Sequence, residues 1–108
     1  MIQVWGGDTF LAGDYCSIGK SLLTMQSDGN FVLYDENGRA RWASNTRNRG
    51  YRAVAQPDGN LVVYNTSGAA IWASNTCCGS YFTGIQADGN VVVYTWSWGV
   101  KWATNTSH

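Results

Sequence analysis

The chain has 108 residues with seven acidic and seven basic side chains, so its formal net charge at pH 7 is zero. This length supports one domain, residues 1–108, and the charge balance argues against a nucleic-acid partner or an anionic membrane surface. Hydrophobic residues make up 44% of the chain, including six Trp, six Tyr and three Phe, which indicates a globular protein. Thirteen Gly against a single Pro predict many tight turns.

The first residues, Met1 to Gly6, contain neither the basic nor the apolar segment of a secretory leader. We therefore expect no signal peptide in this chain, and both cytoplasmic synthesis and a mature secreted form remain open. No run of 18 apolar residues follows, so we expect no membrane insertion.

A 30-residue unit occurs three times. The stretch Gln26–Tyr34 returns as Gln56–Tyr64 and Gln86–Tyr94, and each copy reads Gln-x-Asp-Gly-Asn-x-Val-x-Tyr. Eight residues after each Tyr begins a second shared stretch, Trp-Ala-Ser/Thr-Asn-Thr, which starts at Trp42, Trp72 and Trp102. A fixed period without insertions indicates a repeat architecture.

Each unit is expected to form β-strands, because β-branched and aromatic residues alternate and no long stretch has helical periodicity. In the first copy we predict strands over Leu22–Gln26 and Asn30–Asp35, joined by a type I turn with a left-handed Gly at Ser27-Asp28-Gly29. A second turn over Glu36-Asn37-Gly38 leads to the strand that carries Trp42. In the third copy, Thr95-Trp96-Ser97-Trp98-Gly99 replaces that turn.

The hairpin geometry predicts two faces. One face packs into a core, with the three Trp around a pseudo-threefold axis. The other gathers a carboxylate, two amides, a Val and a phenol in each copy. The fifteen candidate residues are Gln26, Asp28, Asn30, Val32, Tyr34, Gln56, Asp58, Asn60, Val62, Tyr64, Gln86, Asp88, Asn90, Val92 and Tyr94.

Such a set supplies donors and acceptors that match the vicinal hydroxyls of a sugar. For any one copy, ordinary turn chemistry explains Asp-Gly and the following Asn equally well. It does not explain why Gln, Val and Tyr recur, since a turn requires none of them.

This motif in triplicate, with Trp-Ala-Ser/Thr-Asn-Thr after each copy, resembles the bulb-type (monocot, snowdrop-like) mannose-binding lectins over essentially the whole chain. The resemblance implies an all-β fold, the β-prism II, with three four-stranded sheets and pseudo-threefold symmetry. It also implies one site for terminal α-D-mannose in each copy, three equivalent sites in all, with no metal or other cofactor. The Asp, Asn, Gln and Tyr would bond the sugar hydroxyls, and the Val would pack on the ring.

We therefore expect a non-catalytic lectin whose partners are mannose and mannose-containing glycans, with multivalent binding to extracellular glycans. The resemblance also implies a homodimer formed by exchange of the C-terminal strand, which would include Trp102–Thr106. Each copy of the motif offers a single Asp and the one His is the last residue, so a glycosidase is not indicated. The alternative from another class is a protein-interaction or toxin-associated module that uses the same scaffold without sugar dependence.

Two features stay outside this interpretation. Cys16, Cys77 and Cys78 have no metal-ligand spacing, and adjacent cysteines bridge each other only with strain, so we expect free or partly oxidised thiols. Trp96 and Trp98 break the repeat. Stacking on a second sugar ring, a subunit interface and ordinary packing are all open for them.

Overall fold

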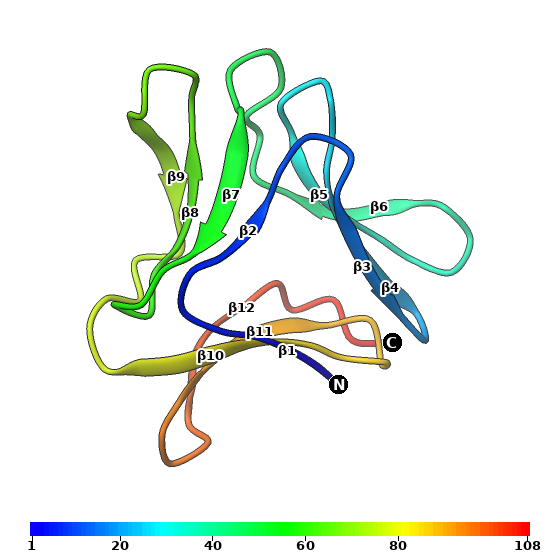
Figure 1. Cartoon of the computed structure of the whole chain (residues 1–108). Coiled ribbons are helices and arrows are strands. Elements are labelled where there is room, and N and C mark those ends of the chain that lie inside the picture. Colours follow the sequence, from blue (N-terminus) through cyan, green and yellow to red (C-terminus); the bar gives the residue numbers. More distant parts are fainter.

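The protein is described by a computed structural model that covers the whole backbone and the side chains of residues 1–79 and 82–108. It is an all-β molecule in which three antiparallel four-stranded sheets form the sides of a triangular prism (Figure 1). The predicted β-prism with pseudo-threefold symmetry is confirmed. Across the part of the chain described, no helix is long and apolar enough to cross a membrane.

Each sheet takes three consecutive strands from one repeat and a fourth from the N-terminal segment. The first sheet has the order β3 (Tyr15–Ile18), β4 (Ser21–Met25), β5 (Phe31–Tyr34), β6 (Ala40–Ala43). The second has the order β2 (Asp8–Phe10), β7 (Arg52–Ala55), β8 (Leu61–Tyr64), β9 (Ala70–Ala73). The third has the order β1 (Ile2–Val4), β10 (Ser80–Ile85), β11 (Val91–Thr95), β12 (Val100–Ala103).

The hairpin between the first two strands of each repeat has the predicted turn. In the first repeat Gly29 N donates to Gln26 O (3.0 Å) and Gln26 N donates to Asn30 O (2.9 Å). Gly29 has a φ of 90°, and its counterparts Gly59 and Gly89 have 89° and 94°. This is the left-handed conformation that Gly adopts without a steric cost. The strands are one residue shorter at the turn than predicted, because Gln26 and Asn30 close the bulged loop.

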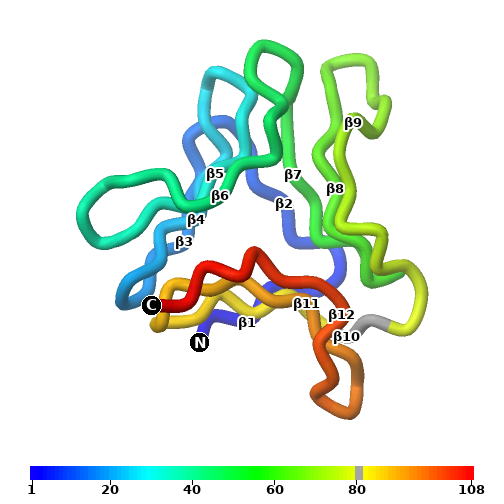
Figure 2. The backbone as a smooth tube through the Cα atoms, turned by 180° about the vertical axis from the view of Figure 1, so that it is seen from behind, coloured from blue at the N-terminus to red at the C-terminus, as the bar shows by residue number. Residues whose placement is uncertain are grey.

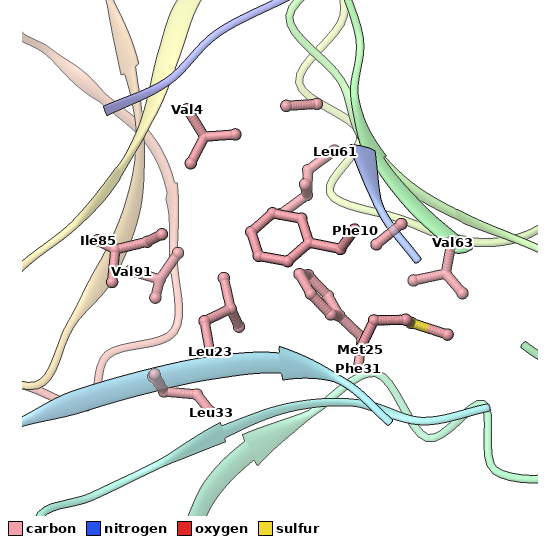
Figure 3. Packing of buried hydrophobic residues seen from close by; sticks show 12 residues of the cluster. Val4, Phe10, Leu23, Met25, Phe31, Leu33, Leu61, Val63, Ile85 and Val91 are labelled. Atoms are coloured by element: carbon pink, nitrogen blue, oxygen red, sulfur yellow. The ribbon is translucent and has the colours of Figure 1, made fainter. Parts of the chain in front are cut away.

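The core lies between the three sheets, where the inward residues of the middle strands meet (Figure 3). Phe31, Leu61 and Val91 are at most 2% exposed. Trp42, Trp72 and Trp102 pack against this core, with ring centroids 5.1 to 5.5 Å apart and their rings edge to face. Edge-to-face aromatic pairs are favourable beyond the apolar area they bury, so the Trp triad holds the three sheets together at the axis.

The N-terminal 18 residues run past all three sheets and add the outer strand to each. In the third sheet Ile2 of β1 pairs with Ile85 of β10, and the first and last strands of the chain are the two edge strands of this sheet (Figure 1). At the opposite edge of that sheet, β12 pairs with β11 of the same chain, with Trp102 opposite Val93. Figure 2 shows β12 next to β11, with the C-terminus close to the β3–β4 hairpin. All three sheets are therefore complete within a single chain.

Candidate functional site

The fifteen candidate residues lie in three groups of five, one on the outward face of each sheet. In each group the Gln, Asp and Asn surround the hairpin turn, and the Val and Tyr follow on the middle strand. The structure thus brings together every residue that the motif singled out. The groups are called the first, second and third site, in chain order, on strands β5, β8 and β11.

The Asp of each site closes the turn and keeps one carboxylate oxygen for other partners. Asn30 N donates to Asp28 Oδ1 at 3.0 Å. The equivalent bonds to Asp58 and Asp88 are 2.9 and 3.1 Å long. Because one oxygen is used by the backbone, the carboxylate is held in one orientation. In the first site the second oxygen, Asp28 Oδ2, lies 3.8 Å from Arg47 Nε.

The Gln and Tyr of each site form a hydrogen-bonded pair. The side-chain amide of Gln26 bonds the hydroxyl of Tyr34, and the second and third sites repeat this contact. For Gln26 the amide orientation that satisfies all partners has Nε2 donating to both oxygens of Asp28, at 3.1 and 3.2 Å, while Oε1 accepts from Tyr34. Phenol, amide and carboxylate of the first site therefore form one connected polar array.

The Asn of each site is oriented from below by the segment that follows the Trp. Asn30 Oδ1 accepts from Thr46 N (3.2 Å) and Ser44 Oγ (3.4 Å). In the third site Asn90 Oδ1 accepts from Thr104 Oγ1 at 2.9 Å. With its oxygen bound to the protein, the amide must turn its Nδ2 outwards, where it offers two N–H donors.

The hydroxyl side chains of this supporting segment are buried in the first two repeats and half-buried in the third. We call them the hydroxyl brace: Ser44 and Thr46 in the first repeat, Ser74 and Thr76 in the second, Thr104 and Thr106 in the third. Thr46 Oγ1 donates to Gly29 O and lies 2.7 Å from Ser44 Oγ. Ser44 Oγ also accepts from Phe31 N at 3.1 Å. The sequence contained the signal for this brace in the repeated Ser/Thr-Asn-Thr, but its contact with the site Asn was not predicted.

The Val of each site lies at the floor and is nearly covered. Val32, Val62 and Val92 are 2%, 2% and 3% exposed, so a ligand can reach only the edge of each side chain. An open groove of about 440 Å³ adjoins the second site without reaching Asn60 or Val62. It is lined by Arg52, Val54, Gln56, Pro57, Asp58 and Tyr64.

The three sites differ in the residue that faces the Tyr from the neighbouring strand. Leu22 faces Tyr34 in the first site. Arg52 faces Tyr64 in the second, with its guanidinium carbon 5.0 Å from the ring centroid, a cation–π contact. In the third site Phe82 faces Tyr94, with ring centroids 5.3 Å apart.

One further group of titratable residues lies outside the three sites. Donor atoms of Asp35, Glu36 and His108 lie within 4.8 Å of one another. Asp35 is already bonded to Arg41 Nε (2.8 Å) and to the backbone N–H groups of Arg39 and Asn37. These bonds, the one from Arg39 foremost, lower the pKa of Asp35 to about 2. The group therefore acts as a structural ion pair and turn closure.

The cysteines correct one expectation. Cys77 and Cys78 form a disulfide, because the tight turn at residues 77–79 places the two adjacent side chains together. Only Cys16 is a free thiol. Burial raises the pKa of Cys16, and the nearby carboxylates of Asp8 and Asp14 raise it further. Its thiolate is therefore disfavoured at neutral pH.

Solved structures resemble the chain over its full length. A monomeric monocot mannose-binding lectin from Gastrodia elata is 40% identical, with all of both chains covered and a TM-score of 0.87. A Polygonatum cyrtonema lectin, solved with a monomannoside, is 35% identical over 97% of this chain and 96% of its own, with a TM-score of 0.78. A Marasmius oreades lectin is 26% identical over 96% of this chain and 90% of its own, with a TM-score of 0.86.

No protein-family model and no curated protein matches the sequence. The structural relatives are nevertheless similar in both fold and sequence, and they bind carbohydrate without catalysing a reaction on it. The chain is a carbohydrate-binding lectin rather than an enzyme, and it belongs to the bulb-type (monocot-type) mannose-binding lectin family.

Proposed function

We propose that the whole chain is one lectin domain that binds terminal α-D-mannose at three sites, without a metal ion. The observation that carries the proposal is the orientation of the site Asn and Asp. In each repeat the hydroxyl brace holds the amide oxygen of the site Asn, which leaves its two amide N–H donors next to a carboxylate held by the turn. A hydroxyl that donates to the carboxylate while its neighbour accepts from the amide satisfies this pair.

The remaining residues extend the same recognition. The Gln–Tyr pair offers further donors and acceptors along the middle strand, and the edge of the Val meets the C–H groups of the ring. Two related structures support mannose as the ligand class: the Polygonatum cyrtonema lectin was solved with a monomannoside and the Tarin lectin with trimannose. Each site is shallow, so we expect weak binding of a single sugar and strong binding only of glycans that engage several sites.

The test is a series of Asp→Asn substitutions, which keep the oxygen that closes the turn and remove the charge. Asp28→Asn, Asp58→Asn and Asp88→Asn should each remove one of three sites for methyl α-mannoside in isothermal titration. Asp14→Asn is the matched control, because Asp14 Oδ2 accepts from Leu11 N (2.8 Å) in a similar turn outside the sites. Loss of all binding on one substitution, with folding intact, would contradict three independent sites. Binding to a glycoprotein that free mannoside does not displace would instead favour a protein-interaction module.

The oligomeric state is part of the same proposal. We expect a homodimer in which the segment Trp102–Thr106 is exchanged, so that β12 of one chain takes the place that it has here beside its own β11. A dimer doubles the number of sites that one glycan surface can engage. Light scattering at micromolar concentration checks this expectation, and a monomer would refute it.

A further inference from the structure

We propose that the third site alone continues into an aromatic platform, where a second sugar ring of a mannose oligosaccharide stacks on Trp98. The inference rests on the proposed function, because it assumes that the first sugar ring occupies the third site. The platform consists of Trp5, Phe82, Tyr94 and Trp98. Tyr94 belongs both to the platform and to the third site.

The backbone of Trp98 is the first observation. Trp98 has a φ of 68°, in the left-handed region where the first two repeats have Gly38 (78°) and Gly68 (83°). For a bulky residue this conformation carries a steric cost that Gly avoids. The hydrogen bond from Trp98 N to Thr95 O (3.1 Å) keeps the turn closed as in the other repeats. The chain therefore tolerates a strained Trp at a position where its own repeats use Gly, and such outliers cluster at functional sites.

The placement of the indole is the second observation. The Trp98 ring lies edge to face with Phe82 and with Tyr94, with centroids 5.3 and 5.5 Å away. Phe82 is buried and also packs against Trp5 at 5.5 Å. These contacts fix the indole, yet 57% of Trp98 stays exposed. A ring that is already ordered loses little conformational freedom when a ligand stacks on it.

The third observation is that the first and second sites lack the platform. Leu22 and Arg52 occupy the positions of Phe82, and Gly occupies the position of Trp98. Along the strand the indole comes after Tyr94, on the side away from the turn that carries Asp88. A ligand that fills the third site and grows towards Tyr94 therefore meets Trp98 next.

Sugar chemistry identifies the occupant. One face of a hexose ring presents several C–H groups, and these pack on the electron-rich face of an indole while the hydroxyls at the rim remain in water. A neutral second ring, linked to the mannose of the third site, fits both the chemistry and the continuity of the surface.

The experiment compares the third site with the second in isolation. Asp28→Asn with Asp58→Asn leaves the third site, and Asp28→Asn with Asp88→Asn leaves the second. Each chain is titrated with methyl α-mannoside and with α1,2-, α1,3- and α1,6-linked mannobiose. For at least one linkage, the ratio of disaccharide to monosaccharide affinity should be roughly threefold to tenfold higher at the third site, as expected for one aromatic contact.

Trp98→Gly should abolish this difference in the third-site chain and leave the ratio in the second-site chain as it was. The variant restores the residue of the other two repeats, and circular dichroism verifies its fold. Trp98→Tyr should recover part of the ratio. Equal ratios at both sites, or a ratio that Trp98→Gly does not lower, would overturn the platform. If none of the sites binds methyl α-mannoside, the proposed function is wrong, and the platform is wrong with it.

Discussion

Removing one hydroxyl from the brace under the first site tests whether the brace orients the site Asn. Ser44 is 6% exposed, and its Oγ accepts from Phe31 N, contacts Thr46 Oγ1 and lies 3.4 Å from Asn30 Oδ1. Ser44→Ala leaves the N–H of fully buried Phe31 without its side-chain acceptor. It also leaves Asn30 Oδ1 with the single bond from Thr46 N.

An unsatisfied buried polar group costs about 1–3 kcal/mol. We therefore expect Ser44→Ala to lower the free energy of unfolding by about 1–3 kcal/mol, a large share of the 5–15 kcal/mol typical of a domain. The melting temperature should fall by roughly 4 °C or more. Mannoside affinity at the first site should also fall, since the Asn30 amide gains freedom to rotate.

The matched control is Ser44→Thr, which gives the first repeat the residue that Thr104 provides in the third. It keeps the hydroxyl and should retain both stability and affinity. Urea denaturation measures the stability. Titration of a chain that also carries Asp58→Asn and Asp88→Asn measures the mannoside affinity of the first site alone. If Ser44→Ala binds mannoside as tightly as the parent chain, the brace does not orient Asn30. If Ser44→Thr lowers stability and affinity as much as Ser44→Ala does, loss of the hydroxyl is not the cause of either effect.

Three further changes test other parts of the structure. Folding lowers the pKa of Asp35 from 3.8 to about 2, so the stability that this carboxylate contributes is present above pH 3.8 and is lost as the pH falls through about 2. In Asp35→Asn the melting temperature should therefore depend less on pH over that range. Bonds to the backbone oxygen of Thr106 and to Glu36 raise the pKa of His108, so its contribution is present below pH 6.5 and is lost as the pH rises through the raised value. The melting temperature, measured from pH 5 to 9, should fall as His108 loses its proton. His108→Gln should remove this pH dependence. Gly50→Ala would place a Cβ 2.0 Å from a backbone oxygen and should cost at least about 2 kcal/mol, more than Gly99→Ala, whose Cβ meets only the Thr95 side chain, at 3.1 Å.

The repeated part of the fold could be predicted from sequence because its signals are local. A type I turn with a left-handed Gly fixes the hairpin register, and the period of two then assigns every side chain to a face. For this reason Phe31 and Leu33 reached the core and Tyr34 the outward face, as predicted. The position of the Trp triad followed from its spacing of 30 residues.

The N-terminal strands could not be predicted in the same way. β1, β2 and β3 have only three or four residues each and lie outside the repeats. β3 pairs with the next strand, β4, but the partners of β1 and β2 are distant, up to 83 positions away in the pair Ile2 and Ile85. Such pairing depends on which sheet edge is open in the folded prism, and a short segment carries no local signal for it.

The brace and the platform were missed for different reasons. The repeated Ser/Thr-Asn-Thr was visible, but only the folded chain shows that its hydroxyls lie beneath the Asn of the hairpin. Trp98 was visible as a break in the repeat. Its contacts with Phe82 and Tyr94 depend on a left-handed backbone that a sequence rule would assign to Gly.

Together these observations separate what the three sites share from what distinguishes them. The turn and the braced Asn are the same in each repeat. The carboxylate of the first site differs in that Asp28 Oδ2 lies 3.8 Å from Arg47 Nε, where the other repeats have Cys77 and Ser107. The residue that faces the Tyr changes from Leu22 to Arg52 to Phe82, and only the third repeat places a Trp in the following turn. These differences lie beside and beyond the Tyr, where a second ring would extend. Selectivity among glycans should therefore arise chiefly at this end of the sites.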